Sequence, residues 1–279
     1  MNRFSRSWEL IKASARVLAA DKELLVFPII SAIASLFVTA AFAIPLFLSG
    51  GISLGAENGF PAIDYLTLFL FYIVQYFVIF FANTALVGAA TIRLKGGDPT
   101  VGDGFRIAFR HFGAILGYAA IAATVGMLLR LVSERSRGLG RLVVSLLGFA
   151  WNIATFLVVP ILAVEGIGPV QAIQRSTALL KKTWGEQIIA NFGVGAIFGL
   201  IVFGLILISL PVFYLLITAE IIWGVIVLAV SLVLAFVLIG LVQSTLNGIY
   251  SAAIYQYAIE ERTGFFDEEM IRGAFVTRS

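Results

Sequence analysis

The chain has 279 residues, of which 60% are hydrophobic and 13% are charged, and its formal net charge is +3. Soluble globular domains carry about 25% charged residues. Together with a mean hydropathy of +1.02, this composition excludes a soluble domain and indicates a membrane protein. The small basic excess gives no reason to expect nucleic-acid binding.

Six uncharged apolar stretches are long enough to cross a bilayer. They lie at residues 24–48, 65–92, 112–129 and 142–164, with two more inside 188–257. A bilayer core offers backbone groups no hydrogen-bond partners, so such stretches are expected to be helices. Turns near residues 49–51, 130–141 and 218–220 join them in pairs. We predict an all-α, polytopic membrane protein with about six transmembrane helices in three hairpins, forming one membrane domain over residues 1–279.

A shorter amphipathic helix is predicted before each hairpin, in residues 4–18, 101–112 and 170–184. Apolar side chains recur there at helical spacing along one stripe. The basic residues that lie off this stripe are Arg6, Lys12, Arg16, Arg106, Arg110, Arg175 and Lys182. Such helices lie in the headgroup plane with their cationic face toward anionic lipid. The alternative is a connecting helix that packs on the spans without binding lipid specifically.

Recurrence of this unit predicts internal repeats at residues 1–95, 96–165 and 166–260, followed by a cytoplasmic tail at 261–279. All but four of the 19 Lys and Arg residues fall before the first span, between the repeats or after the last span. Basic residues concentrate on the cytoplasmic side of membrane proteins. We therefore expect a multi-pass plasma-membrane protein with both termini in the cytoplasm.

The other four basic residues cluster in the loop of the second hairpin and are Arg130, Arg135, Arg137 and Arg141. We consider them candidate contacts for an anion or a lipid headgroup, because guanidinium groups bind phosphate and sulfate in a bidentate way. One alternative is a solvated loop that Glu134 partly neutralises. Another is that this pair of helices is too short to reach the far side.

Polar side chains within the spans are mostly amides. The candidates are Gln75, Asn83, Asn152, Gln243 and Asn247. Unpaired amides are costly in hydrocarbon, so they are expected to face the bundle interior. There they either line a polar path or form hydrogen bonds between helices, and the second role is the commoner one.

Two GxxxG patterns occur in the third and fifth spans. The first pairs Gly113 with Gly117, and the second pairs Gly195 with Gly199. Small residues at this spacing predict close contact between helices, whether within the chain or between two copies of it.

No catalytic residues, metal ligands or cofactors are predicted. The chain has no cysteine and its single histidine is His111, so thiol chemistry and an HExxH zinc site are excluded. Residues 51–55 match the GxSxG pattern of a hydrolase nucleophile. That pattern requires a strand-turn-helix context and a nearby histidine base, whereas here it follows an apolar helix.

A family resemblance rests on four segments. FSRSWELIK at residues 4–12 and LLVFP at 24–28 resemble the start of a prokaryotic six-span membrane protein family of unknown function. GPVQAIQRS at 168–176, with KKTW at 181–184, is similar to a repeat found in that family and in the membrane domain of some glycerophosphodiester phosphodiesterases. The general layout also resembles the sulfate permeases of cysteine biosynthesis. Phosphodiesterase activity is not implied, because the soluble domain that carries it is missing from this chain.

Two functions remain as hypotheses. The first is a non-enzymatic membrane protein that organises the membrane and binds lipid, with anionic headgroups, a partner membrane protein or a second copy of the chain as its partners. The alternative is a small permease or channel for anions, with the amides lining its path. The absence of charged residues inside the spans counts against coupled ion transport but not against a passive channel.

Overall fold

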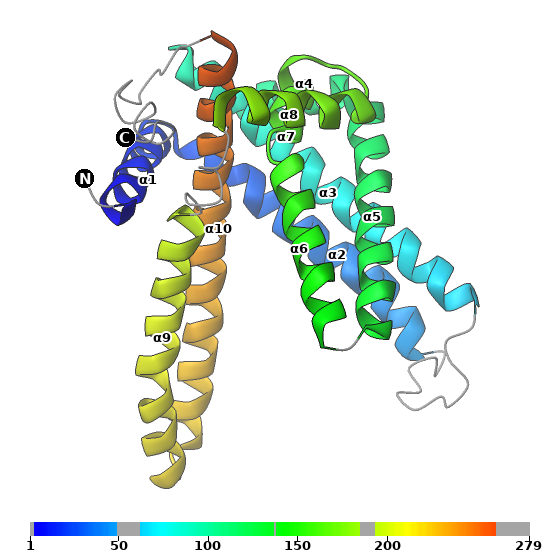
Figure 1. Ribbon diagram of the computed structural model, residues 1–279. Coiled ribbons are helices and arrows are strands. Elements are labelled where there is room, and N and C mark those ends of the chain that lie inside the picture. Colours follow the sequence, from blue (N-terminus) through cyan, green and yellow to red (C-terminus); the bar gives the residue numbers. More distant parts are fainter. Residues whose placement is uncertain (1–2, 49–61, 137, 185–192, 261–279) are drawn as a thin grey trace.

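The structure is a computed structural model that describes residues 3–48, 62–136, 138–184 and 193–260 (Figure 1). In chain order the described elements are α1 (Arg3–Ala20), the 3-10 turn η1 (Lys22–Leu25), α2 (Val26–Leu48), α3 (Ala62–Leu94), α4 (Val101–Arg110), α5 (Phe112–Arg135), α6 (Leu139–Ala154), α7 (Val158–Val164), α8 (Pro169–Trp184), α9 (Gly193–Thr218) and α10 (Ile222–Glu260). The prediction of an all-α protein is confirmed.

Six helical segments are long and apolar enough to cross a membrane, at Lys22–Leu48, Tyr65–Leu94, Phe112–Arg135, Leu139–Val164, Ile197–Thr218 and Ile222–Gln256. They form three hairpins, and a short helix precedes each one. Figure 1 shows that α1, α4 and α8 lie at one end of the molecule, which we call the platform end. The turns after α5 and α9 lie at the opposite end, which we call the hairpin end. The boundaries of the three sequence repeats stay a prediction.

Helix α4 begins with a capping box, which explains why its short sequence is helical. The Thr100 hydroxyl accepts a hydrogen bond from the Asp103 backbone N–H at 3.2 Å, and the Asp103 carboxylate accepts one from the Thr100 N–H at 3.1 Å. The Thr100 hydroxyl also donates to Asp103 Oδ2 at 2.7 Å. This bond first, and then the one from the Thr100 N–H, holds the pKa of Asp103 below its ordinary value. Gly104 and Ala108 face the core, whereas Phe109 and Arg110 are exposed. Helix α4 therefore buries a face of small residues against the bundle and leaves both Phe109 and Arg110 outside it.

Helix α3 is the hub of the bundle, because it packs on α2, α4, α5, α7 and α10. The half of α3 that lies at the platform end is rich in small buried residues, which are Ala82, Ala85, Gly88, Ala89 and Ala90. Small side chains let neighbouring backbones approach closely. A Cβ atom at Gly104 of α4 would lie 2.7 Å from the Ala85 carbonyl oxygen and would collide with the Phe27 ring.

The fourth span is not one continuous helix. It breaks between α6 and α7 at residues 155–157, three residues before Pro160. The Leu157 N–H, which lies outside both helices, donates to the buried Ser176 hydroxyl of α8 at 3.2 Å. A broken helix at membrane depth is tolerated where a neighbouring side chain satisfies the freed backbone group.

The second hairpin differs from its prediction at the arginine-rich segment. We expected a loop over residues 130–141, but α5 continues to Arg135 and α6 begins at Leu139. The helix continues because arginine is a good helix former and because Arg130 and Glu134 form a pair one turn apart. With 24 residues, α5 is about 36 Å long, which is long enough to cross a hydrocarbon core of about 30 Å.

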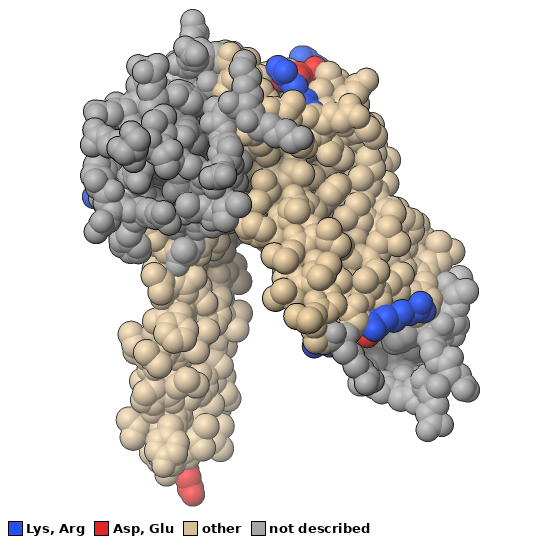
Figure 2. Space-filling model, in the orientation of Figure 1, with Lys and Arg blue, Asp and Glu red and all other residues tan. Residues whose placement is uncertain are grey.

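The α9–α10 hairpin stands apart from the other spans over most of its length (Figures 1 and 2). Helix α9 packs mainly on α10 and α1, and no described atom lies within 4 Å of a Cβ built at Gly195 or Gly199. Gly117 does make a close contact, because its Cβ would lie 2.9 Å from Pro169 Cγ on α8. A Cβ at Gly113 meets no described atom within 4 Å. Among the described residues, the predicted close packing is therefore found at one of the four glycines.

We expect Ser176→Ala to lower the free energy of unfolding by about 1–3 kcal/mol, because the Leu157 N–H would lose its only side-chain partner in a buried position. The matched control is Thr177→Val, which removes a hydroxyl that bonds only within its own helix, to the Ile173 carbonyl. Thermal denaturation in detergent, followed by far-UV circular dichroism, measures both. Equal losses in the two variants would contradict this account of the break.

Gly104→Ala should destabilise the protein by about 1–3 kcal/mol, because the added methyl group overlaps Phe27 and the Ala85 carbonyl. Gly102→Ala lies on the same helix in open surroundings, with only the Thr100 hydroxyl near, at 3.6 Å. It should be neutral or stabilise the helix by up to about 1 kcal/mol. The same denaturation experiment tests the pair, and a harmless Gly104→Ala would contradict close packing of α4 on α3.

Candidate functional site

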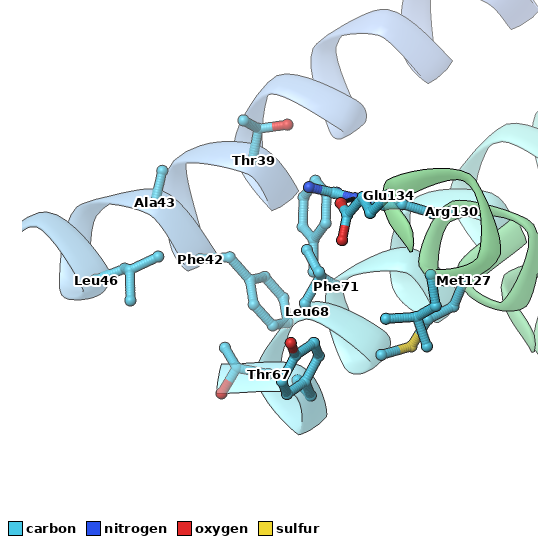
Figure 3. Close-up of a pocket in the computed structure, with 12 residues that line it drawn as sticks. Thr39, Phe42, Ala43, Leu46, Thr67, Leu68, Phe71, Met127, Arg130 and Glu134 are labelled. Carbon is cyan, nitrogen blue, oxygen red and sulfur yellow. Dashed lines mark hydrogen bonds and ion pairs between the residues drawn. The ribbon is translucent and has the colours of Figure 1, made fainter. Parts of the chain in front are cut away.

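A pocket of about 330 Å³ lies toward the hairpin end, between α2, α3 and α5 (Figure 3). Its lining consists of Thr39, Phe42, Ala43, Leu46, Tyr65, Thr67, Leu68, Phe71, Met127, Arg130, Leu131 and Glu134. Helix α3 forms the floor, and α2 and α5 form the two walls. Both walls pack along α3 but make at most marginal contact with each other, so the groove stays open between them.

Arg130 is held in place at the mouth of this pocket. Its Nε donates to Glu134 Oε1 at 2.8 Å, and its Nη1 donates to the Tyr72 hydroxyl at 2.8 Å. The side chain is still 52% exposed. A guanidinium has five N–H donors in a fixed fork. Bonds to described residues use two of them, which leaves three for a ligand.

A column of aromatic rings on α3 positions the Tyr72 hydroxyl. Tyr72 stacks on Tyr76 with ring centroids 6.1 Å apart, and Tyr76 stacks on Phe80 at 5.7 Å. Phe80 in turn packs on Tyr118 of α5 at 4.5 Å. At Gly126 the two helices approach closely, because a Cβ there would lie 3.3 Å from the Tyr76 hydroxyl oxygen. The rings therefore fix the direction in which Arg130 points.

The depth of Arg130 suits a lipid headgroup. It precedes the end of α5 by five residues, which is about 7.5 Å along the axis. A long basic side chain at this depth reaches the headgroup level while its stem stays in the apolar region. Figure 2 shows the same division, with charged residues at the ends of the molecule and an uncharged belt between them.

Two of the other three candidate arginines do not line the pocket. Arg135 and Arg141 are exposed on α5 and α6, and Arg137 lies outside the described residues. Of the three described arginines, Arg130 is therefore the one that combines a fixed guanidinium with apolar walls.

The candidate amides are spread over the bundle. Gln75, Asn83 and Gln243 are half-buried, whereas Asn152 and Asn247 are exposed. No hydrogen bond joins any two of them in the part of the chain that the structure describes, and the Gln75 Oε1 atom is buried without a partner. The amide that does bridge two helices is another residue of the sixth span: Gln256 donates to the Thr91 carbonyl of α3 at 3.2 Å.

The candidate interfacial basic residues gather at the platform end. Exposed members are Lys12, Arg16, Arg106, Arg110 and Arg175, whereas the side chains of Arg6 and Lys182 lie outside the described residues. Arg175 donates to Glu165 at 3.2 Å, and the same carboxylate oxygen accepts a bond from the Tyr255 hydroxyl at 3.1 Å. This basic residue therefore helps to join α8 to α10 as well as facing the surface.

Three features of the pocket were not predicted. From the sequence alone, Glu134 is taken only as a charge that neutralises the loop, and Tyr72 and the wall formed by α2 are not included. The spacing of Arg130 and Glu134, one helical turn apart, was a usable signal. Nothing local links Tyr72 to Arg130, because 58 residues separate them.

Comparison with known proteins finds no match among curated proteins and none among solved structures. It gives no support to the resemblance to the phosphodiesterase membrane domain or to the sulfate permeases. A family does match: the sequence model described as "Family of unknown function (DUF6159)" covers residues 62–265, which is well over half of the chain and includes α3 and α5 of the pocket. The chain belongs to this family of unknown function.

Proposed function

We propose that this protein is a non-enzymatic membrane protein that binds phospholipid, with the phosphate of one headgroup held by Arg130. The observation that carries the proposal is the fixed but half-exposed guanidinium at the mouth of an apolar groove. Guanidinium groups bind phosphate through two parallel N–H···O bonds. The two charged side chains that line the pocket, Arg130 and Glu134, are paired with each other, which favours binding over acid-base chemistry.

The walls of the groove suit the part of a lipid next to its phosphate. Phe42 and Phe71 pack edge to face with centroids 5.5 Å apart, and Leu46, Leu68 and Met127 complete an apolar lining. Helices α2 and α5 share at most marginal contact, so a lipid would enter between them from the bilayer with its headgroup at the level of Arg130. A pocket of about 330 Å³ accommodates a headgroup and the first carbons of a chain, at the lower end of ordinary ligand sites.

A permease or channel for anions is the alternative. A polar path requires the candidate amides to face one passage. Asn152 and Asn247 are exposed on α6 and α10, and these two helices share at most marginal contact. The scattered amides therefore favour lipid binding.

We also propose that the protein lies in the plasma membrane with the platform end on the cytoplasmic side. Exposed basic residues at that end, such as Lys12, Arg16 and Arg110, support this orientation. They also fit contact with anionic headgroups of the inner leaflet. The Arg130 pocket then faces the outer leaflet. The separate α9–α10 hairpin leaves apolar surface for a second copy of the chain or a partner membrane protein.

Arg130→Gln should weaken phospholipid binding by about tenfold or more, because a charge-assisted phosphate contact is lost. Binding of phosphatidylethanolamine and phosphatidylglycerol to the delipidated protein is measured by native mass spectrometry from detergent. Arg135→Gln is the matched control, because it removes an exposed arginine of the same helix that does not line the pocket. Equal binding by all three proteins would contradict the proposal. Circular dichroism checks that each variant is folded.

The orientation has a direct test, because the chain has no cysteine. Lys95→Cys lies at the platform end and Arg141→Cys at the hairpin end, and each removes one positive charge from an exposed position. A membrane-impermeant maleimide should label the second variant in intact cells and the first only after permeabilisation. The reverse pattern would contradict the proposed orientation.

A further inference from the structure

We propose that the pocket selects a phospholipid whose headgroup carries a primary ammonium group as well as its phosphate, as phosphatidylethanolamine does. Glu134 binds the ammonium and Arg130 binds the phosphate. This inference rests on the proposed function and adds the class of lipid.

Glu134 lies where the second charge of such a headgroup would be. It follows Arg130 by one helical turn on α5, and both side chains line the same pocket (Figure 3). Its side chain is 55% exposed, and Oε1 is the oxygen that accepts from Arg130. A carboxylate can accept about four hydrogen bonds, so most of its capacity is open to a donor that enters the groove.

The charge balance at the mouth of the pocket favours a zwitterion. Arg130 and Glu134 together carry no net charge, and they are the two charged residues among the described side chains that line the pocket. A headgroup with a net negative charge gains from Arg130 but is repelled by Glu134. A headgroup with a phosphate and an ammonium offers each side chain an opposite charge, and each can make a further charge-assisted bond through the donors and acceptors that their mutual bond leaves unused.

The nature of the receiving group favours a primary over a quaternary ammonium. A carboxylate accepts hydrogen bonds, so it binds a cation with N–H donors more strongly. A primary ammonium has three such donors, whereas a choline group has none. Quaternary ammonium groups are usually held by the faces of several aromatic rings. In this pocket the rings of Phe42 and Phe71 pack against each other edge to face at 5.5 Å, and they form a wall.

The walls also favour an intact lipid over a soluble phosphate ester. Beyond the two charged residues and the hydroxyl groups of Thr39, Tyr65 and Thr67, the lining is apolar. Burial of apolar surface is favourable only if the ligand supplies apolar surface of its own. The headgroup alone would leave these walls uncovered.

The experiment compares phosphatidylethanolamine, phosphatidylcholine and phosphatidylglycerol with identical acyl chains, each titrated onto the full-length delipidated protein and measured by native mass spectrometry. Wild type should bind phosphatidylethanolamine about tenfold more tightly than either of the others, as expected for one additional charge-assisted bond. Soluble glycerophosphoethanolamine, added as a competitor, should displace it only weakly.

The variant Glu134→Gln tests directly whether Glu134 selects the headgroup. It should weaken phosphatidylethanolamine binding by about tenfold and leave phosphatidylglycerol binding equal or stronger, because the repelling charge is gone. A merely structural role for Glu134 would weaken all three lipids together. Ala43→Phe, which fills the groove from α2 without changing its charge, should weaken all three lipids and serves as the contrasting variant.

Three outcomes would overturn the inference. They are equal binding of the three lipids by wild type, an unchanged preference in Glu134→Gln, and displacement by glycerophosphoethanolamine as strong as by the lipid. In each of these cases, loss of binding in Arg130→Gln would still support a phospholipid site. If Arg130→Gln leaves the binding of every lipid unchanged, the proposed function itself fails.

Discussion

Helix α3 can pack against several helices at once because its side chains change in size along its length. Between residues 82 and 90 more than half of them are Ala or Gly, and α2, α4, α7 and α10 all approach this helix. Gly104 of α4 and Gly248 of α10 make contacts there that a Cβ atom would obstruct. In a bilayer, helices associate through such van der Waals contact and not through exclusion of water. The tight platform end therefore depends on this stretch.

The other half of α3 has the opposite steric character, and the pocket follows from it. Residues 65–81 include eight aromatic side chains, at Tyr65, Phe69, Phe71, Tyr72, Tyr76, Phe77, Phe80 and Phe81. Tyr65 and Phe71 of this set line the groove between α2 and α5. Tyr72, Tyr76 and Phe80 stack along the same half of α3. Tight packing at one end and an open groove at the other thus result from one helix. The same rings fix Tyr72, and Tyr72 fixes Arg130.

Much of the local structure was predictable, because hydropathy and helical periodicity are local properties. The six spans, the short amphipathic helices and the turn near Thr218 are found where the sequence places them. The prediction of a loop in the arginine-rich segment was wrong. A charged residue can continue a helix beyond the apolar region when it has a partner one turn away. Arg130 was identified as a candidate on charge alone, without the neighbours that make it a site.

The sequence by itself determined that this is a membrane protein, how many spans it has and that its charged residues lie at the two ends of the molecule. These properties depend on composition within short windows. The tertiary structure decided which candidates meet. Arg130 joins Tyr72 across 58 residues and Tyr255 joins Glu165 across 90, while Asn152 and Asn247 point away from the packed interior. The rotation of each helix about its own axis decides such contacts. That rotation is set by packing against neighbours, and a nearly uniform apolar sequence does not specify it.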